Sequence, residues 1–140
     1  MPMTASARRV DGTPQHTIDV NRRHIIATDL PERLGGTDSA PSPHELLAAM
    51  LASCVSTMID IYARARHWDL PDVSVAVVYD PSVTPRHVEV TLNLPEGLTA
   101  DQIAGLRRVA DTCPVKRALE AGFTFTQEVA LVPPALRPAA

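Results

Sequence analysis

The clearest structural signal in the chain is the stretch Ser42-Pro43-His44-Glu45-Leu46-Leu47-Ala48-Ala49-Met50-Leu51-Ala52-Ser53-Cys54. It opens with a helix start, because Ser42 suits the N-cap, Pro43 suits the first helical position and Glu45 completes a capping box. The apolar run behind this start predicts a long central helix that ends near His67. Its one interruption is a narrow polar stripe at helical spacing, formed by Ser53, Ser56, Thr57, Asp60 and Arg64.

Two short strands and a loop precede this helix. Residues 16–20 and 24–28 read as strands that are joined around Asn21-Arg22. Residues 30–43 are rich in Gly, Pro, Ser and Asp, so we expect a mobile loop there, with a hinge at Gly35-Gly36.

Further strands and helices follow the central helix. Residues 73–79 and 87–94 are rich in β-branched side chains and predict an antiparallel pair. Thr99 caps the next helix, Pro114 begins a shorter one, and residues 123–132 supply a last strand. The order β-β-α-β-β-α-α-β contains no repeated βαβ unit, and it therefore predicts an α+β fold.

Length and composition are those of one globular domain. The chain has 140 residues, is 45% hydrophobic and contains two cysteines, which are too few for a disulfide scaffold. We expect a flexible tail over residues 1–14, a single domain over residues 15–132 and a Pro- and Ala-rich tail over residues 133–140. The formal net charge of −3 is spread along the chain, which argues against nucleic acid as a partner.

No targeting or membrane segment is expected. Arg8-Arg9 is not followed by the apolar stretch of a secretory signal, and the apolar run from Leu46 to Ala52 is too short to cross a bilayer. The sequence therefore predicts a soluble cytoplasmic protein in which free thiols stay reduced.

Cys54 lies deep in the apolar helix. Its helix face also carries Leu47, Met50 and Met58, and a cysteine in such surroundings is more often an inert core residue than a reactive one. Burial alone raises a thiol pKa. A reactive Cys54 would therefore need a cation or a hydrogen-bond donor from elsewhere in the protein.

Cys113 has the more favourable local electrostatics. Because Pro114 suits the first helical position, Cys113 falls at or next to a helix N-cap, where unpaired N–H groups favour a thiolate. Lys116 and Arg117 follow within one turn. The alternative is a half-buried cap residue, and the spacing alone does not separate the two interpretations.

Glu45 has a sufficient structural role as the third residue after Ser42. It precedes Cys54 by nine residues, which puts the two on opposite sides of the helix with a rise of about 13 Å between them. A Cys54 that Glu45 assists would therefore belong to a second subunit, so a joint role implies a dimer with shared sites.

Metal and phosphate sites are not predicted. The five histidines show no paired ligand spacing, and Ala48 stands where a His-Glu-x-x-His zinc helix would need its second histidine. Gly35-Gly36 lacks the pattern of a phosphate-binding loop. We therefore expect no metal and no cofactor.

Two segments together carry a family resemblance. The first includes Asp29-Leu30-Pro31, then Gly35-Gly36, then a Pro-Ser-Pro-x-Glu-Leu-Leu motif and the Ala-x-Cys that ends at Cys54; the second is Cys113-Pro114-Val115-Lys116. As a set, these motifs resemble the OsmC/Ohr family, the osmotically inducible and organic hydroperoxide resistance proteins, over about residues 15–132. The segment around His24 and Asp29 is more similar to the OsmC-like branch.

The resemblance implies an intertwined homodimer, in which two long central helices are wrapped by antiparallel β-sheets. It also implies a stress-response function, the thiol-dependent reduction of organic hydroperoxides, with Cys54 as the peroxidatic thiolate and Cys113 as the resolving thiol. Glu45 matches the acidic position of the family. A dithiol, in this family often a lipoyl group, would then reduce the disulfide.

The resemblance further implies a cation at the site. Family peroxidases hold the active thiolate with an arginine from the N-terminal region. Four arginines of this region are the candidates for that role: Arg9, Arg22, Arg23 and Arg33.

Two functions follow from these observations. The leading hypothesis is an enzyme, a cofactor-free cysteine peroxidase for apolar hydroperoxides, with Leu47, Met50 and Met58 lining the approach to Cys54. The alternative is a noncatalytic OsmC-like protein, either a redox sensor or a binder of small apolar ligands. A Cys54 pKa below the reference value of about 8.5 would favour the enzyme.

Overall fold

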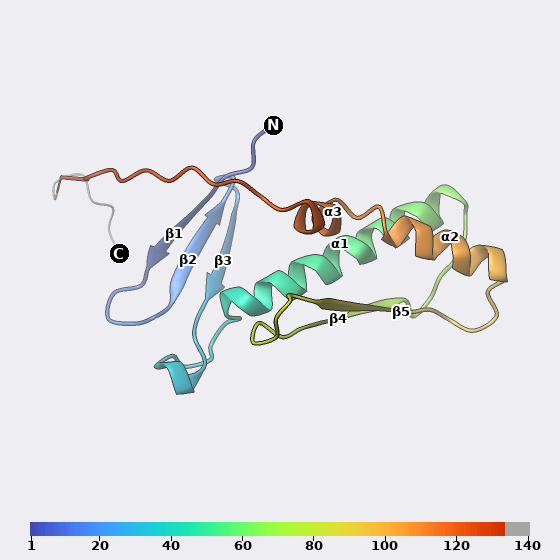
Figure 1. Cartoon of the computed structure of the whole chain (residues 1–140), viewed down its shortest axis with the longest axis horizontal. Helices are drawn as coiled ribbons and strands as arrows, with labels where there is room; N and C mark the ends of the chain where they lie inside the picture. The colour runs from blue at the N-terminus through green and yellow to red at the C-terminus, as the bar shows by residue number, and fades with distance from the viewer. Residues whose placement is uncertain (134–140) are drawn as a thin grey trace. The chain divides into compact units, whose positions relative to one another are not determined.

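The structure is a computed structural model of the chain, and it describes residues 1–133. The fold belongs to the α+β class, as predicted (Figure 1). In chain order they are β1 (Ala5–Arg9), β2 (His16–Val20), β3 (His24–Thr28), the 3-10 helix η1 (Glu32–Leu34), α1 (Pro43–Ala65), β4 (Ser74–Tyr79), β5 (Val88–Asn93), α2 (Ala100–Ala110) and α3 (Pro114–Ala121). The chain forms two compact units: residues 1–46 with 126–133, and residues 47–125.

The first unit contains a three-stranded antiparallel sheet in the order β1-β2-β3. The turn between β2 and β3 places Asn21 and Arg22 at φ values of 54° and 56°, as a type I′ hairpin turn requires. The flexible tail predicted for residues 1–14 is wrong in part, because β1 pairs with β2 over its whole length. Every residue of β1 is exposed, so the sequence shows no alternation of buried and exposed residues that would predict this strand. The strand forms because its backbone pairs with β2 through hydrogen bonds.

The loop between β3 and α1 is fixed by one buried carboxylate. Asp29 is 1% exposed and accepts five hydrogen bonds: from the Leu30 N–H, and from both the N–H and the hydroxyl of Thr37 and of Ser39. The Ser39 N–H leads the donors that hold the Asp29 pKa far below its usual range, against the opposing effect of burial. The structure thus shows this loop held by hydrogen bonds to Asp29, where the sequence predicts a mobile loop.

Gly36 serves close packing in this loop and not hinge motion. A Cβ at this position would lie 1.8 Å from the backbone oxygen of Leu30, so only glycine lets the two backbone segments approach this closely. Gly35 adopts a φ of 88° at the end of η1, which is the left-handed region that favours glycine.

The predicted start of α1 is confirmed. The Ser42 N–H donates to Glu45 Oε2 at 2.7 Å, and the Glu45 N–H donates to the Ser42 hydroxyl at 3.4 Å, so the capping box is closed. The helix ends at Ala65, and the Trp68 N–H then donates to the Ala63 carbonyl at 2.9 Å. By length and composition α1 could cross a membrane, with a mean hydropathy of 1.7 over its most apolar window. Its buried residues belong instead to the core of the second unit.

The core of the second unit joins three helices and a hairpin. Leu51, Val55 and Ile59 of α1 meet Leu106 and Ala110 of α2, with the fully buried Cys113 beside them. The antiparallel β4–β5 hairpin packs against this cluster, mainly through Val75, Val77, Val88 and Leu92. Burial of these side chains is the main stabilising contribution to this unit.

The starts of α2 and α3 also agree with the prediction. Thr99 and Gln102 form a reciprocal capping box at α2, and Cys113 is the N-cap of α3 with Pro114 at its first turn. The strand predicted over residues 123–132 is absent from this chain. A strand needs a neighbour for its backbone hydrogen bonds, and this segment has none within the part of the chain that the structure describes.

Candidate active site

Two sulfur atoms lie together in the second unit, although 59 residues separate them in the sequence. Cys113 Sγ lies 2.7 Å from Cys54 Sγ, and both cysteines are free. Cys54 comes from the middle of α1 and is half-buried, whereas Cys113 comes from the α2–α3 junction and is fully buried. The two sulfurs are therefore close enough to form a disulfide, after a small adjustment of the side chains, once one of them has been oxidised.

The α2–α3 junction places Cys113 by a tight succession of backbone hydrogen bonds. The Thr112 N–H donates to Val109, the Cys113 N–H donates to Ala110, and α3 begins directly afterwards at Pro114. Cys113 Sγ then accepts the Lys116 N–H at 3.4 Å, which is the bond that a serine or threonine hydroxyl would make at an ordinary N-cap. The sequence signal for a helix start thus also fixes the position of a thiol.

The environment of Cys54 favours its protonated form. Burial is the main cause that raises the Cys54 pKa, and the hydrogen bond with Cys113 adds to the rise. The Val115 N–H acts in the opposite direction by donating a hydrogen bond to the sulfur.

No cation in the described part of the chain offsets that rise. In residues 1–133 no hydrogen bond or ion pair joins a lysine or arginine side chain to Cys54. Lys116 is the nearest basic residue in sequence to Cys113, but its ammonium bonds Asp111 at 2.6 Å and approaches Glu120 at 3.7 Å. The hydrogen bond to Asp111 is the main cause of a raised Lys116 pKa, so the Lys116 ammonium is already paired with carboxylates.

Glu45 belongs to the first turn of α1 and is engaged in its cap. The Ser42 N–H is the main cause of its lowered pKa, so the carboxylate is ionised and structurally occupied. The four N-terminal arginines are all in the first unit, with Arg9 on β1, Arg22 and Arg23 at the β2–β3 turn, and Arg33 in η1. The roles predicted for Glu45 and for an arginine therefore stay predictions.

A cavity of about 500 Å³ lies between α1, α3 and the β4–β5 hairpin, and neither cysteine is among its lining residues. Leu47 and Leu51 line it from α1, and Lys116 and Leu119 line it from α3. Met50 and Met58, which the sequence predicts to line the approach to Cys54, are not among its lining residues. Met50 is 46% exposed, and Met58 packs against the core.

Sequence reasoning missed the roles of Asp29 and of the Val115 N–H. The sequence contains a signal for the role of Asp29: the aspartate stands directly before Leu30-Pro31, and Thr37 and Ser39 follow in the same loop. A carboxylate in a loop commonly accepts hydrogen bonds from nearby hydroxyl and backbone N–H groups. The Val115 donor has no signal in the side chains. Among the described residues, no group of three histidine, cysteine, aspartate or glutamate side chains is arranged to hold a metal ion.

Comparisons with known proteins identify the family of the chain. The family model of OsmC-like protein matches residues 36–128, which is more than half of the chain. A crystal structure from Psychrobacter arcticus 273-4, of a protein named for osmotic stress induction and detoxification response, is 28% identical with a TM-score of 0.68, and the match covers 81% of this chain and 85% of that one. No curated protein sequence matches this chain.

Two further structures belong to proteins named for organic hydroperoxide resistance. The one from Vibrio cholerae, with captopril in one of its active sites, is 25% identical with a TM-score of 0.57, and the match covers 83% of each chain. The OsmC protein from Legionella pneumophila is 22% identical with a TM-score of 0.59 over 85% of this chain and 89% of that one, and it shares the fold. The chain therefore belongs to the OsmC/Ohr family of OsmC-like proteins.

Proposed function

We propose that this protein is a cysteine peroxidase that reduces organic hydroperoxides to alcohols. The observation that carries the proposal is the 2.7 Å distance between Cys54 Sγ and Cys113 Sγ. Cys54 is the more accessible of the two thiols and is assigned the attack on the peroxide, while the buried Cys113 is assigned the resolving step. Membership of a family that includes hydroperoxide resistance proteins supports the same chemistry.

The reaction proceeds in three steps. The Cys54 thiolate attacks the distal peroxide oxygen, the O–O bond breaks, and the alkoxide takes a proton and leaves as an alcohol; Cys54 becomes a sulfenic acid. Cys113 then attacks that sulfur, so that a disulfide forms and water leaves. An external dithiol, of which a lipoyl group is one example, exchanges with the disulfide and restores both thiols.

We also propose that the active form is a homodimer, because residues 1–133 of one chain bring no positive charge to the Cys54 thiolate. Supply of an N-terminal arginine by a second subunit would lower the Cys54 pKa, which burial raises in the single chain, and we place Glu45 of that subunit at the same site. An exposed apolar segment supports the pairing of two subunits. The segment over residues 123–132 exposes alternate apolar side chains, at Phe123, Phe125, Val129 and Leu131.

The proposed substrates are apolar hydroperoxides. The cavity between α1, α3 and the β4–β5 hairpin is bounded in part by aliphatic side chains, among them Leu47, Val88 and Leu119. Its volume of about 500 Å³ suits an organic molecule rather than hydrogen peroxide alone. The chemistry also needs a compartment that keeps thiols reduced, and we place the protein in the cytoplasm for that reason.

The raised Cys54 pKa favours one alternative, a redox sensor that forms its disulfide slowly. Such a protein needs the two adjacent sulfurs but no activated thiolate. The rate of disulfide formation separates the two functions, because an enzyme must react much faster than a free thiol of ordinary pKa.

Peroxide turnover tests the proposal. Purified protein is supplied with cumene hydroperoxide and a dithiol, and loss of peroxide is followed for the wild type and for Cys54→Ser and Cys113→Ser. We expect turnover in the wild type, none in Cys54→Ser, and at most one turnover per site in Cys113→Ser, which cannot resolve its sulfenic acid.

Serine matches cysteine closely in shape, so these variants keep the fold, and circular dichroism checks that they do. Consumption in Cys54→Ser at the wild-type rate would eliminate the peroxidase assignment. A wild-type rate no faster than that of free cysteine at the same pH would leave the sensor as the function.

A further inference from the structure

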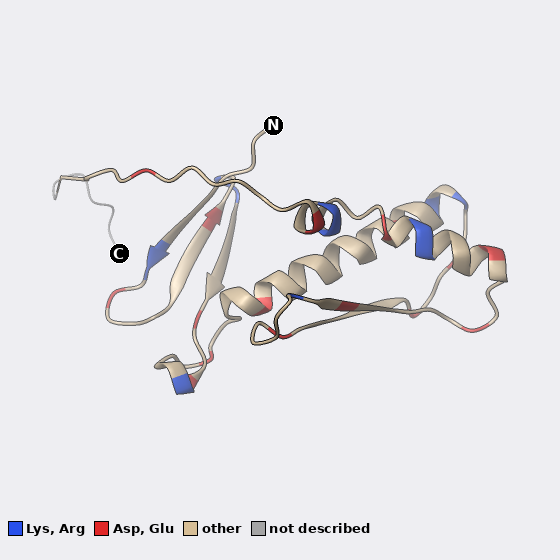
Figure 2. Cartoon of the chain, viewed as in Figure 1, with Lys and Arg blue, Asp and Glu red and all other residues tan. Residues whose placement is uncertain are grey.

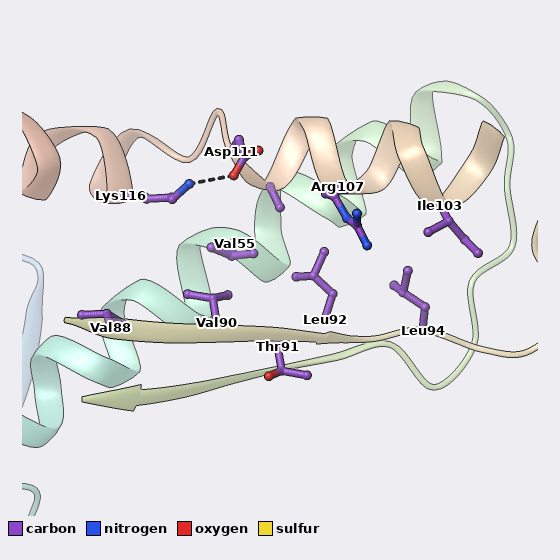
Figure 3. Close-up of a pocket in the computed structure, with 11 residues that line it drawn as sticks. Val55, Val88, Val90, Thr91, Leu92, Leu94, Ile103, Arg107, Asp111 and Lys116 are labelled. Carbon is purple, nitrogen blue, oxygen red and sulfur yellow. Dashed lines mark hydrogen bonds and ion pairs between the residues drawn. The ribbon is translucent and has the colours of Figure 1, made fainter. Parts of the chain in front are cut away.

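A second groove in the same unit likewise has no cysteine in its lining, and it shares Val88, Val90 and Lys116 with the cavity described above. It lies between β5 and the helices α2 and α3, and its volume is about 590 Å³ (Figure 3). That volume falls within the range of small-molecule sites, roughly 300–1,000 Å³. The groove therefore has the size to bind an organic ligand independently of the dithiol.

The long wall of the groove is apolar. Val88, Val90 and Leu92 alternate along β5 and so point to the same side of the strand. Val55 of α1 and Ile103 of α2 face them (Figure 3). Val90 is 36% exposed and Ile103 is 39% exposed, so this surface is open to a ligand from solvent.

One positive charge on the opposite wall has no counterion among the described residues. Figure 3 shows the Arg107 side chain reaching from α2 toward Leu92 and Leu94. In residues 1–133, no hydrogen bond or ion pair engages this guanidinium. The other cation of the groove, Lys116, is neutralised by Asp111.

The helix dipole explains a basic residue near the end of α2 but not this placement. Arg107 and Arg108 both lie in the last turn, where a cation interacts favourably with the helix C-terminus. Figure 2 shows this basic segment on α2. Only Arg107 lines the groove. The two neighbours therefore share the dipole effect and differ in their access to a ligand.

We propose that this groove binds a linear amphipathic carboxylate, with its chain against Val90, Leu92 and Ile103 and its headgroup on Arg107. A guanidinium pairs with a carboxylate through two parallel hydrogen bonds, which no other group in the lining can offer. Burial of the chain removes the exposed aliphatic surface of β5 and α2 from water. The site requires neither cysteine, so it does not rest on the proposed peroxidase activity.

Isothermal titration with decanoate tests the proposal on the full-length reduced protein. We expect saturable binding to the wild type, weakened about tenfold in Arg107→Gln because a charged hydrogen-bond pair is lost. Arg108→Gln is the matched control, since it removes the same charge one residue away, and its affinity should stay within about twofold of the wild type. Decan-1-ol, which has no charge, should bind the wild type and Arg107→Gln equally.

A second measurement locates the ligand. Methyl resonances of Val90 and Leu92 should shift with decanoate, and Ile103→Trp should abolish binding by filling the groove. If Ile103→Trp does not fold, the methyl shifts decide alone. Absence of saturable binding, equal losses in the two arginine variants, or shifts confined to other methyl groups would overturn the proposal. So would concentration-dependent protection of Val90, because a second copy of the chain would then cover the groove.

Discussion

Asp29 and Cys54 are both acidic side chains shielded from water, and their surroundings drive their pKa values in opposite directions. Five hydrogen bonds, led by the Ser39 N–H, hold the Asp29 pKa far below its usual range. Cys54 receives one backbone hydrogen bond, from Val115, and burial raises its pKa. The number of donors decides the difference, because a buried charge persists only where protein donors replace water.

The surroundings of Asp29 fully stabilise its charge, whereas the described surroundings of Cys54 do not stabilise a thiolate. The loop of the first unit provides the whole environment of its own carboxylate, so Asp29 serves as a structural anchor. The second unit brings two sulfurs together but supplies no positive charge to Cys54 within the described residues. In our account, that charge comes from a second subunit.

Replacement of the anchor should have the largest effect on stability. Asp29→Asn leaves the same donors with a neutral acceptor, so the loop and the start of α1 should unfold more readily at pH 7. Because the folded-state pKa of Asp29 is depressed, its contribution is full above the unfolded value of about 3.9 and is lost as the pH falls below it. Urea unfolding at several pH values should therefore show a difference from the wild type that shrinks in acid.

Asp38→Asn is the control for this experiment. Asp38 lies in the same loop but is exposed, and asparagine tolerates its φ of 53°. Equal destabilisation in both variants, or a difference that does not depend on pH, would refute the anchor role of Asp29.

Removal of the single donor to Cys54 should have an intermediate effect. Val115→Pro deletes the N–H that donates to Cys54 Sγ, at a first-turn position where the helix makes no use of it. The Cys54 pKa should rise further, and each unit of pKa changes the thiolate fraction about tenfold at pH values below it. Iodoacetamide labelling of Cys54 at pH 8 should therefore slow several-fold relative to Val115→Ala, which keeps the donor. Equal labelling rates in the two folded variants would remove the Val115 N–H from the account.

Loss of the N-cap hydrogen bond of α2 should leave the reactivity of the thiols unchanged. Thr99→Ala removes the hydroxyl acceptor of the α2 capping box and should cost about 1 kcal/mol of the free energy of unfolding. Its hydrogen bonds do not involve either sulfur, so Cys54 labelling should match that of the wild type. A labelling rate altered as much as in Val115→Pro would mean that reactivity follows global stability and not the local donor.

The sequence predicted the elements whose signals are local. Ser42, Thr99 and Pro114 mark the starts of α1, α2 and α3, because capping depends on residues within one turn. The turn at Asn21-Arg22 was also readable from the residues that flank it. Among the site residues, the N-cap position of Cys113 followed from Pro114 alone.

The features that were missed depend on distant parts of the chain. Strand β1 carries no apolar alternation and exists through its pairing with β2. The segment over residues 123–132 has strand-like alternation, yet a strand also requires a partner. The contact between Cys54 and Cys113 was implied by the family resemblance, since no spacing rule connects residues so far apart.

A single turnover with one equivalent of cumene hydroperoxide tests the central claim most directly. Peptide mass spectrometry of the quenched protein should show a Cys54–Cys113 disulfide with one equivalent of alcohol released, and Cys113→Ser should show a trapped Cys54 sulfenic acid with the same amount of alcohol. Alcohol release without that disulfide, or equal release from Cys54→Ser, would contradict the account.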